Sequence, residues 1–456
     1  YDAGVQLTTG SANVAIGAYA LDAETTSGGN TAIGYQALTS NSNTTAAYNT
    51  AVGYEALLSN TTGINNTAVG KNACRTITTG ERNTGVGVQA LGNTSTGTTN
   101  NVAVGVNALY NTTGSSNTAC GDAALYTNTS GANNTAMGRN ALFVNTTGNT
   151  NTAVGNYALD ANTTASNGVA IGYQALTSNT TGAQNTAVGR DALEANTTGG
   201  YNVAVGSGAL DSNTTTNYNT AVGFEALQEN TASNNTAVGY KALEENTTGA
   251  SNTSIGYESL TANTTGERNV AVGAYALDAN TTGNYNSAFG NYSLTASNGD
   301  SNTALGYYTL AANTTGDSNV AIGYDALGDS TTASHNTAVG RASICKNTTG
   351  TRNVAVGNYS LELNETGDDN VAIGYEALES NIGSNNIAIG SYALDDATTA
   401  EQNTAIGYQA LTAATTGGSN VAVGALSLKS VTTAVCNVAV GRDALEANTG
   451  SNLVAV

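Results

Sequence analysis

One short phrase, Asn-Thr/Val-Ala-Val/Ile-Gly, recurs from one end of this 456-residue chain to the other. It ends at Gly17, Gly34 and so on to Gly441, which gives 26 such glycines, and 19 of the 25 intervals between them are 17 residues long. A short, uniform period is the signature of a solenoid, in which each repeat packs only on its neighbours. The period therefore predicts an elongated array and favours a structural or adhesive role over a catalytic one.

A single repeat contains two different patterns. Residues 49–52 are short and alternating, and the residue before the glycine is apolar in all 26 repeats, which predicts a strand with that side chain facing inward. Gly53, Ala56, Leu57 and Asn60 then follow at i, i+3, i+4 and i+7, the spacing of one face of a helix. The place of Leu57 holds Leu in 24 of the 26 repeats, so a row of stacked leucines is expected to form the core.

These patterns predict a parallel β-solenoid of about 27 coils of 17 residues. Each coil is a short strand, a helical or 3-10 turn, and a polar return loop of the Asn-Thr-Thr-Gly type. An all-β roll is the alternative, because the Ala-Leu pair also suits a second strand. Residues 1–456 read as one continuous array, and since both ends fall inside a coil, we expect the chain to be a segment of a longer polypeptide.

The composition limits the classes of molecule that the chain is expected to bind. Twelve Lys and Arg against 32 Asp and Glu give a net charge of −20, which repels nucleic acid and anionic membranes alike. No apolar run approaches the roughly 18 residues of a membrane span. The absence of Pro and Trp, with only three Phe, fits a thin core of small residues and strands that all pair with neighbours.

No constellation of residues indicates catalysis. The single histidine, His335, lies in a variable loop position, and the four cysteines are too far apart in the array to form disulfides, so we expect ordinary thiols. Neither a repeated Gly-x-Asp calcium pattern nor a strand-GxGxxG-helix unit occurs. The sequence therefore predicts no catalytic residue, no metal ligand and no cofactor, and a protein that is not an enzyme.

Asn-x-Thr/Ser triplets recur at or beside the return loop, where they match the acceptor for N-glycosylation. Turn chemistry is the alternative reading, because Asn, Thr and Gly also suit a tight loop. The sixteen candidate glycosylation sites are Asn43, Asn60, Asn93, Asn111, Asn128, Asn145, Asn162, Asn179, Asn196, Asn213, Asn246, Asn263, Asn280, Asn313, Asn347 and Asn364.

Three further rows of residues suggest surfaces or ladders. The strand position held by Ala in 24 of 26 repeats alternates with the predicted inward Val or Ile, so it is a candidate assembly face for other chains, represented by Ala15, Ala32, Ala51, Ala68 and Ala204. The two positions after the glycine hold 16 of the 23 tyrosines, either as a sugar-stacking ridge or as a cover over the edge of the core. The opening Asn, present in 25 of 26 repeats, predicts stacked amides along the axis.

The phrases Asn66-Thr67-Ala68-Val69-Gly70 and Asn151-Thr152-Ala153-Val154-Gly155, followed by Ala-Leu and Asn-Thr-Thr-Gly, resemble repeats of phage tail-fibre-like and adhesin proteins. They are more distantly similar to the head repeats of YadA-type trimeric autotransporter adhesins. The resemblance implies an extracellular or surface location and the shaft of a fibre, filament or adhesin that associates with itself. Glycans are expected from the Asn-x-Thr/Ser triplets. A receptor- or glycan-binding tail fibre and an ice-binding solenoid are the alternatives.

Overall fold

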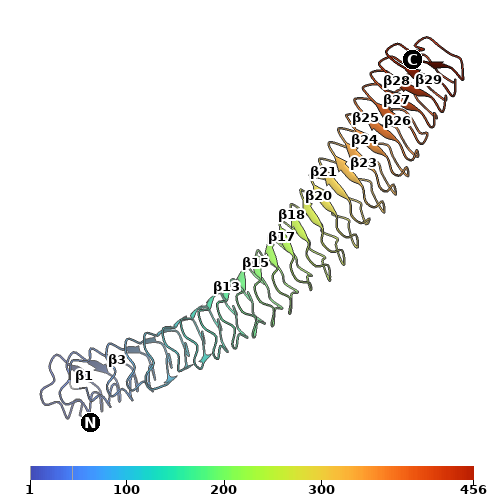
Figure 1. The fold of residues 1–456 in the computed structure, drawn as a ribbon. Helices are drawn as coiled ribbons and strands as arrows, with labels where there is room; N and C mark the ends of the chain where they lie inside the picture. Colours follow the sequence, from blue (N-terminus) through green and yellow to red (C-terminus); the bar gives the residue numbers. More distant parts are fainter. Residues whose placement is uncertain (1, 44) are drawn as a thin grey trace. The chain divides into compact units, whose positions relative to one another are not determined.

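The structure, a computed structural model, describes residues 2–43 and 45–456; Tyr1 and Thr44 lie outside the described residues. The chain divides into two compact units, Tyr1–Ser233 and Asn234–Val456. In each unit, one short strand per coil pairs in parallel with the strand of the next coil, as in a ladder (Figure 1). The predicted parallel β-solenoid is confirmed, and the single array over residues 1–456 stays a prediction.

The strands of the first unit are mostly three residues long. They are β1 (Val14–Ile16), β2 (Thr31–Ile33), β3 (Thr50–Val52), β4 (Thr67–Val69), β5 (Thr84–Val86), β7 (Val102–Val104), β9 (Thr118–Cys120), β11 (Thr135–Met137), β12 (Thr152–Val154), β13 (Val169–Ile171), β14 (Thr186–Val188), β15 (Val203–Val205) and β16 (Thr220–Val222). A second, three-stranded parallel sheet lies on the return-loop part of the coils and contains β6 (Asn93–Thr94), β8 (Asn111–Thr112) and β10 (Thr127–Asn128).

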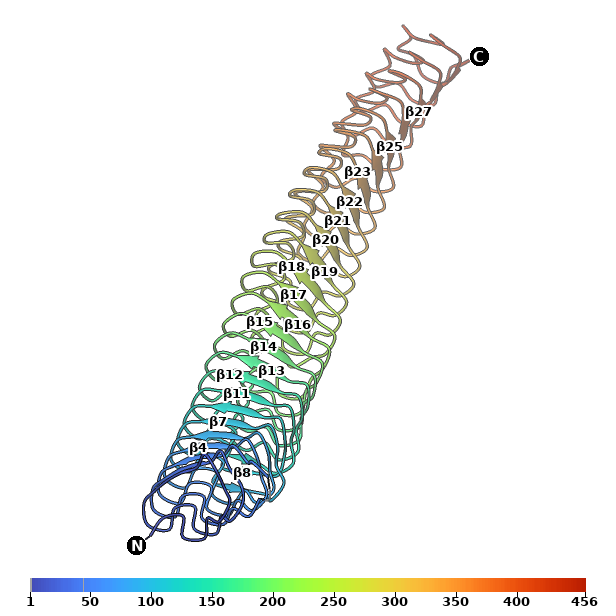
Figure 2. The same ribbon diagram turned by 90° about the vertical axis from the view of Figure 1, so that its left-hand side faces the viewer.

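The second unit repeats the same plan. Its strands are β17 (Thr236–Val238), β18 (Thr253–Ile255), β19 (Val270–Val272), β20 (Ser287–Phe289), β21 (Thr303–Leu305), β22 (Val320–Ile322), β23 (Thr337–Val339), β24 (Val354–Val356), β25 (Val371–Ile373), β26 (Ile387–Ile389), β27 (Thr404–Ile406), β28 (Val421–Val423), β29 (Val438–Val440) and β30 (Val454–Ala455). Figure 2 shows β17 to β27 following one another in a single row, with the return loops on the other side of the coils.

The strand register is constant, but its inward face is the opposite of the predicted one. Ala51 pairs with Ala68 and Val52 with Val69 in neighbouring strands. The alanines are buried, whereas Val69 is 37% exposed and Ile16 is 58% exposed. The prediction that the Val or Ile faces the core is therefore wrong.

The candidate assembly face is wrong for the same reason. Ala32, Ala51, Ala68 and Ala204 are fully buried and Ala15 is half-buried. A coil of about 17 residues is thin, and its stacked leucines already occupy the centre. Only a methyl group then fits between the strand and the rest of the core. This restriction explains why the position is almost always Ala, and no contact with another chain is needed to explain it.

Contacts at the exceptional positions show how closely the strand approaches the Ala-Leu segment. Ser254 replaces the strand Ala and Ser259 replaces the Ala before Leu260 in the same coil. Their Oγ atoms lie 2.5 Å apart, and Ser254 also donates to the Ser259 carbonyl at 2.7 Å. The two Ala rows are therefore direct neighbours inside the coil.

The segment after the glycine is a pair of tight corners and not the predicted helical or 3-10 turn. No described residue lies in a helix. Glu55 and Leu57 both have positive φ, 52° and 51°. The residues at these two places also have positive φ in all of the other coils. Two left-handed residues separated by one of negative φ bend the chain sharply, so that Ala56, Leu57 and Asn60 all reach the core without a helix.

The corners are stabilised by hydrogen bonds between backbone groups of neighbouring coils, which run along the axis of the solenoid. Leu57 N–H donates to the Ala73 carbonyl of the next coil at 3.0 Å, and Glu55 N–H donates to the Tyr35 carbonyl of the previous coil at 2.9 Å. A left-handed conformation costs a non-glycine residue about 1–2 kcal/mol. The axial hydrogen bond and the full burial of the leucine side chain offset this cost.

The glycine that ends each strand is required by its surroundings. Gly53 has φ of 137°, and a Cβ there would stand 2.5 Å from the carbonyl oxygen of Gly70 in the next coil. Both the left-handed backbone and this close approach exclude a side chain. The period of the sequence is thus the period of a backbone contact that only glycine permits.

Candidate functional surfaces

The opening Asn of each coil forms a ladder with the backbone. Asn49 Oδ1 accepts the Asn66 N–H of the next coil at 2.9 Å, and Asn49 Nδ2 donates to the Gly63 carbonyl at 2.8 Å. The amide therefore joins the strand of its own coil to the return loop and to the following coil. Its burial is complete, so its role is to satisfy buried polar groups.

Direct amide-to-amide stacking occurs mainly at the second Asn, the one in the return loop. Asn145 Nδ2 donates to Asn128 Oδ1 at 2.7 Å, and Asn145 Oδ1 accepts from Asn162 Nδ2 at 2.7 Å. Each of these amides also bonds to a loop carbonyl, as Asn145 does to Gly148 at 3.0 Å. Stacked amides of this kind stabilise the axial contact between identical coils.

This inner ladder removes most of the candidate glycosylation sites from the surface. Fourteen of the sixteen candidate asparagines are buried, so for them the expectation of an exposed acceptor is wrong. A glycan on Asn145 Nδ2 would displace two hydrogen bonds and need space that the adjacent coils occupy. The buried residues are Asn43, Asn60, Asn128, Asn145, Asn162, Asn179, Asn196, Asn213, Asn246, Asn263, Asn280, Asn313, Asn347 and Asn364.

Asn93 and Asn111 differ because they begin their loops one residue early. Most ladder asparagines follow the core leucine by three residues, as Asn60 follows Leu57, but Asn93 and Asn111 follow theirs by two. Thr94 and Thr112 take the inward place instead and are buried. Asn93 is consequently exposed and Asn111 half-buried, which makes them the two candidate sites that the fold leaves accessible. The spacing from the leucine was the sequence signal that distinguishes them.

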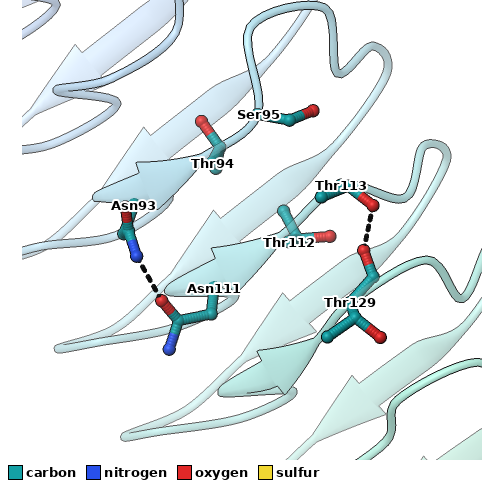
Figure 3. A pocket seen from close by; sticks show the side chains of 7 residues that line it. All are labelled: Asn93, Thr94, Ser95, Asn111, Thr112, Thr113 and Thr129. Atoms are coloured by element: carbon teal, nitrogen blue, oxygen red, sulfur yellow. Dashed lines mark hydrogen bonds between the residues drawn. The ribbon is translucent and has the colours of Figure 1, made fainter.

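A groove of about 290 Å³ lies over the small sheet of β6, β8 and β10 (Figure 3). Asn93 Nδ2 donates to Asn111 Oδ1 at 2.6 Å along one edge of this groove, and Thr113 Oγ1 donates to the Thr129 carbonyl along the other. Its lining consists of amides and hydroxyls, without a titratable group: Asn93, Thr94, Ser95, Asn111, Thr112, Thr113 and Thr129. Such a lining offers neutral hydrogen bonds and no acid, base or nucleophile of shifted pKa.

The tyrosines after the glycine contact one another along the axis, some face to face and others edge to face. Tyr240 and Tyr257 lie 5.2 Å apart with an interplanar angle of 9°, Tyr275 meets Tyr257 edge to face at 5.4 Å and 65°, and Tyr292 stacks on Tyr275 at 5.1 Å. Contacts between neighbouring rings therefore cover part of each ring. This arrangement fits the interpretation as a cover at the corner better than a sugar-stacking ridge, which needs open ring faces.

Glu376, Glu379 and Asp395 form an acidic cluster in the second unit, with one carboxylate oxygen of each within 4.8 Å of the others. Burial, and then the neighbouring Glu379 charge, raise the pKa of Asp395 to about 7. Burial likewise raises the pKa of Glu379. The cluster therefore holds its negative charge at an energetic cost near neutral pH.

The cysteines and the histidine do not form a catalytic pair in the described residues. Cys345 is buried and donates to Asp325 Oδ2 at 3.3 Å, and burial raises its thiol pKa to about 12. Cys74 is also buried, and its pKa is raised to about 12 by desolvation. His335 is exposed on the loop side. All four cysteines are free thiols, and Cys120 and Cys436 are exposed.

The outward residues of the strands make one more surface, which we call the outer strand face. It consists of the first and third residues of strands β1 to β5, β7, β9 and β11 to β16 in the first unit, and of β17 to β29 in the second. The first residue is Thr, Val, Ser or Ile, and the third is always apolar. Third residues such as Met137, Ile171 and Phe289 are 40–45% exposed. No residue of the outer strand face carries a charge.

Comparison with known proteins adds no family. No protein-family model matches the chain, and no curated protein matches it. Residues 2–43 and 45–456 contain no helix that is sufficiently long and apolar to span a membrane.

Proposed function

We propose that this chain is a structural segment of an extracellular fibre, filament or adhesin, and that it acts as a stiff shaft without enzymatic activity. The observation that carries the proposal is the axial hydrogen bonding, which joins each coil to the next at the strand, at both corners and in the return loop. Thr50, Glu55, Leu57 and Thr61 illustrate these four places, with N···O distances of 2.8 to 3.0 Å to neighbouring coils.

A shaft of this kind works through many small, identical contacts. One backbone hydrogen bond contributes about 0.5–1.5 kcal/mol net, and each coil boundary contains several, besides the buried Leu and Asn rows. Thr side chains add to them: Thr146 Oγ1 donates to the Thr163 carbonyl of the next coil at 2.8 Å. Because stability arises between adjacent coils, length can be extended by repetition without a change of design.

The alternatives have less support. A glycan-binding fibre would use open aromatic faces, whereas the tyrosine rings contact one another, some face to face and others edge to face. An ice-binding solenoid would present Thr-x-Thr on its strands, whereas the second outward residue of each strand is apolar, as in Thr186–Val188. Neither alternative explains why the backbone ladder surrounds the whole coil.

Electron microscopy and fibre diffraction of material from the source cells test the proposal. An antibody against the purified chain should decorate filaments on intact, unpermeabilised cells, and aligned filaments should give a reflection near 4.8 Å along the axis. Labelling that requires permeabilised cells, or that follows a soluble fraction without filaments, would refute the proposed function.

A further inference from the structure

We propose that the outer strand face is the surface through which two copies of this chain pack side by side. This inference deepens the proposed function, because it names the partner of the shaft as a second shaft. It also replaces the buried Ala row as the assembly surface.

Charge distinguishes this face from the rest of the coil. The chain carries a net charge of −20, so two copies repel each other over most approaches. Positions beside the corners carry many of these charges, for example Glu55, Asp191 and Glu258. The outer strand face has none in any coil, so it is the surface on which two acidic chains meet with the least repulsion.

The exposed apolar area is sufficient for a stable interface. An aliphatic side chain exposes roughly 60–120 Å² when fully free, so the third residues that are about 40% exposed offer about 25–50 Å² each and the half-buried ones offer less. With the Thr or Val methyl groups added, about ten coils on each of two copies approach the roughly 1,200 Å² at which specific interfaces begin. Each unit has at least that many coils. The share of one copy, about 600 Å², is at the upper end of the apolar patches that single soluble proteins leave in water, and patches of that size are often interaction sites.

The axial period selects a second copy over another partner. The face presents uncharged side chains of similar kind at a repeat of about 4.8 Å, coil after coil. A second copy carries the same repeat, so a contact that is favourable at one coil is favourable at every coil. A globular partner matches this repeat at a few coils only. Two sheets packed face to face about 10 Å apart also bury the outward residues symmetrically.

The chain contains a natural probe and a natural control. Cys120 is the third residue of β9 and belongs to the outer strand face, whereas Cys436 lies just before Asn437 on the loop side, and both are exposed free thiols. We expect N-ethylmaleimide to label both in dilute protein. As the concentration of the intact chain rises and association is followed by sedimentation, labelling of Cys120 should fall at least fivefold while labelling of Cys436 stays constant. Equal labelling of both thiols in associated material would overturn the proposal.

Surface variants supply the second measurement. Ile171→Lys and Val222→Lys place a charge on the outer strand face at positions that are 40% and 36% exposed, so the coil tolerates the side chain. Both together should abolish association and leave the β-sheet circular dichroism unchanged. The matched control, Thr181→Lys with Thr215→Lys, changes two exposed loop residues and should associate as the wild type does. Association that survives the face variants would refute the assignment.

The outcomes also separate this inference from the proposed function. Surface filaments whose Cys120 stays reactive would leave the shaft intact and reject the face as the contact. Soluble dimers with a protected Cys120, but without filaments on cells, would support the outer strand face as the contact between copies and refute the proposed role in a fibre. A monomer that shows thermal hysteresis, lost in the Ile171→Lys variant, would assign the face to ice and overturn the pairing.

Discussion

The thiol of Cys74 occupies the space that a side chain on Gly85 would need. A Cβ built on Gly85 would stand 2.6 Å from Cys74 Sγ and 3.1 Å from the Ala90 carbonyl oxygen. Cys74 replaces a core leucine and Gly85 replaces a strand alanine, so the two exceptions to the repeat lie in contact. They therefore form one local variant of the core and not two unrelated substitutions.

We predict that Gly85→Ala alone destabilises the coil, because the new methyl group must displace the buried thiol. Cys74→Leu combined with Gly85→Ala recreates the pairing found in the other coils and should be at least as stable as the wild type. The coupling between the two changes should be on the order of 1 kcal/mol. Denaturant titration of the four proteins measures it, and additive effects would show that the contact has no energetic consequence.

A second prediction concerns the core leucines. Leu193 is fully buried, and its N–H donates to the Ala209 carbonyl at 3.0 Å. Leu193→Asp places an unpaired charge in the core, which costs several kcal/mol in that coil and its two boundaries. We expect local opening, because coils are stabilised by nearest neighbours. Amide hydrogen exchange should rise within about two coils of residue 193, and a uniform rise throughout the chain would contradict this view.

Much of the fold was predictable from the sequence, because a period of 17 with an invariant glycine specifies stacked coils. The side of the strand that faces inward was not. Alternation in Thr50–Val52 allows either Ala51 or Val52 to face inward, and a one-residue shift reverses the whole face. Hydrophobicity favoured Val52, whereas the space left beside the leucines admits only a methyl group. That space is a property of the closed coil and is absent from any single strand.

The sequence predicts a helical turn at the corners and exposed amides in the return loops, and both predictions are wrong for related reasons. The spacing of Gly53, Ala56 and Leu57 is the same for a helix turn as for two left-handed corners, which are distinguished by their positive φ values and axial hydrogen bonds. The triplet at Asn145 matches a glycosylation acceptor, yet its amide lies inside the coil. A motif defines the chemistry of an acceptor but not its exposure, which depends on the neighbouring coils.

A third prediction separates amides that belong to the ladder from one that does not. In the next coil Ile77 holds the place of Asn60, where most coils have another Asn, and both side-chain polar atoms of Asn60 are buried without a hydrogen-bond partner. Asn60→Val should therefore be neutral or stabilising. Asn145→Val leaves Asn128 and Asn162 each without one ladder bond and should cost about 2–4 kcal/mol. Val431 holds the same place in another coil, so the side chain itself fits. Equal costs for the two variants in denaturant titration would contradict the ladder.

A fourth prediction is that stability of the second unit falls as the pH rises from about 4 to about 7. The folded pKa of Asp395 is about 7 and that of Asp278 about 6, both raised by burial, against an unfolded value of about 3.9. The folded state therefore binds more protons than the unfolded state in this range, so raising the pH favours unfolding. Thermal melts at pH 5 and 8 measure the slope.

The matching variants test the source of that slope. Asp395→Asn should raise the melting temperature at pH 8 and flatten the dependence on pH. Asp369→Asn is the control, because Arg352 lowers the pKa of this exposed carboxylate and its contribution has the opposite sign. A wild type whose melting temperature rises between pH 5 and 8 would show that the acidic cluster does not dominate.

The last prediction concerns covalent glycan. If the source cells modify Asn-x-Thr/Ser triplets on the folded chain, the exposed Asn93 should carry the glycan and the half-buried Asn111 at most a partial one. The buried ladder amides should carry none, because a glycan on Asn145 Nδ2 would remove its bonds to Asn128 and to the Gly148 carbonyl. Intact-mass and peptide mass spectrometry of filaments from the source cells decide this. A mass that corresponds to glycans on most of the sixteen triplets would mean that the loops of the native chain open outward, and the buried amide ladder would then be wrong.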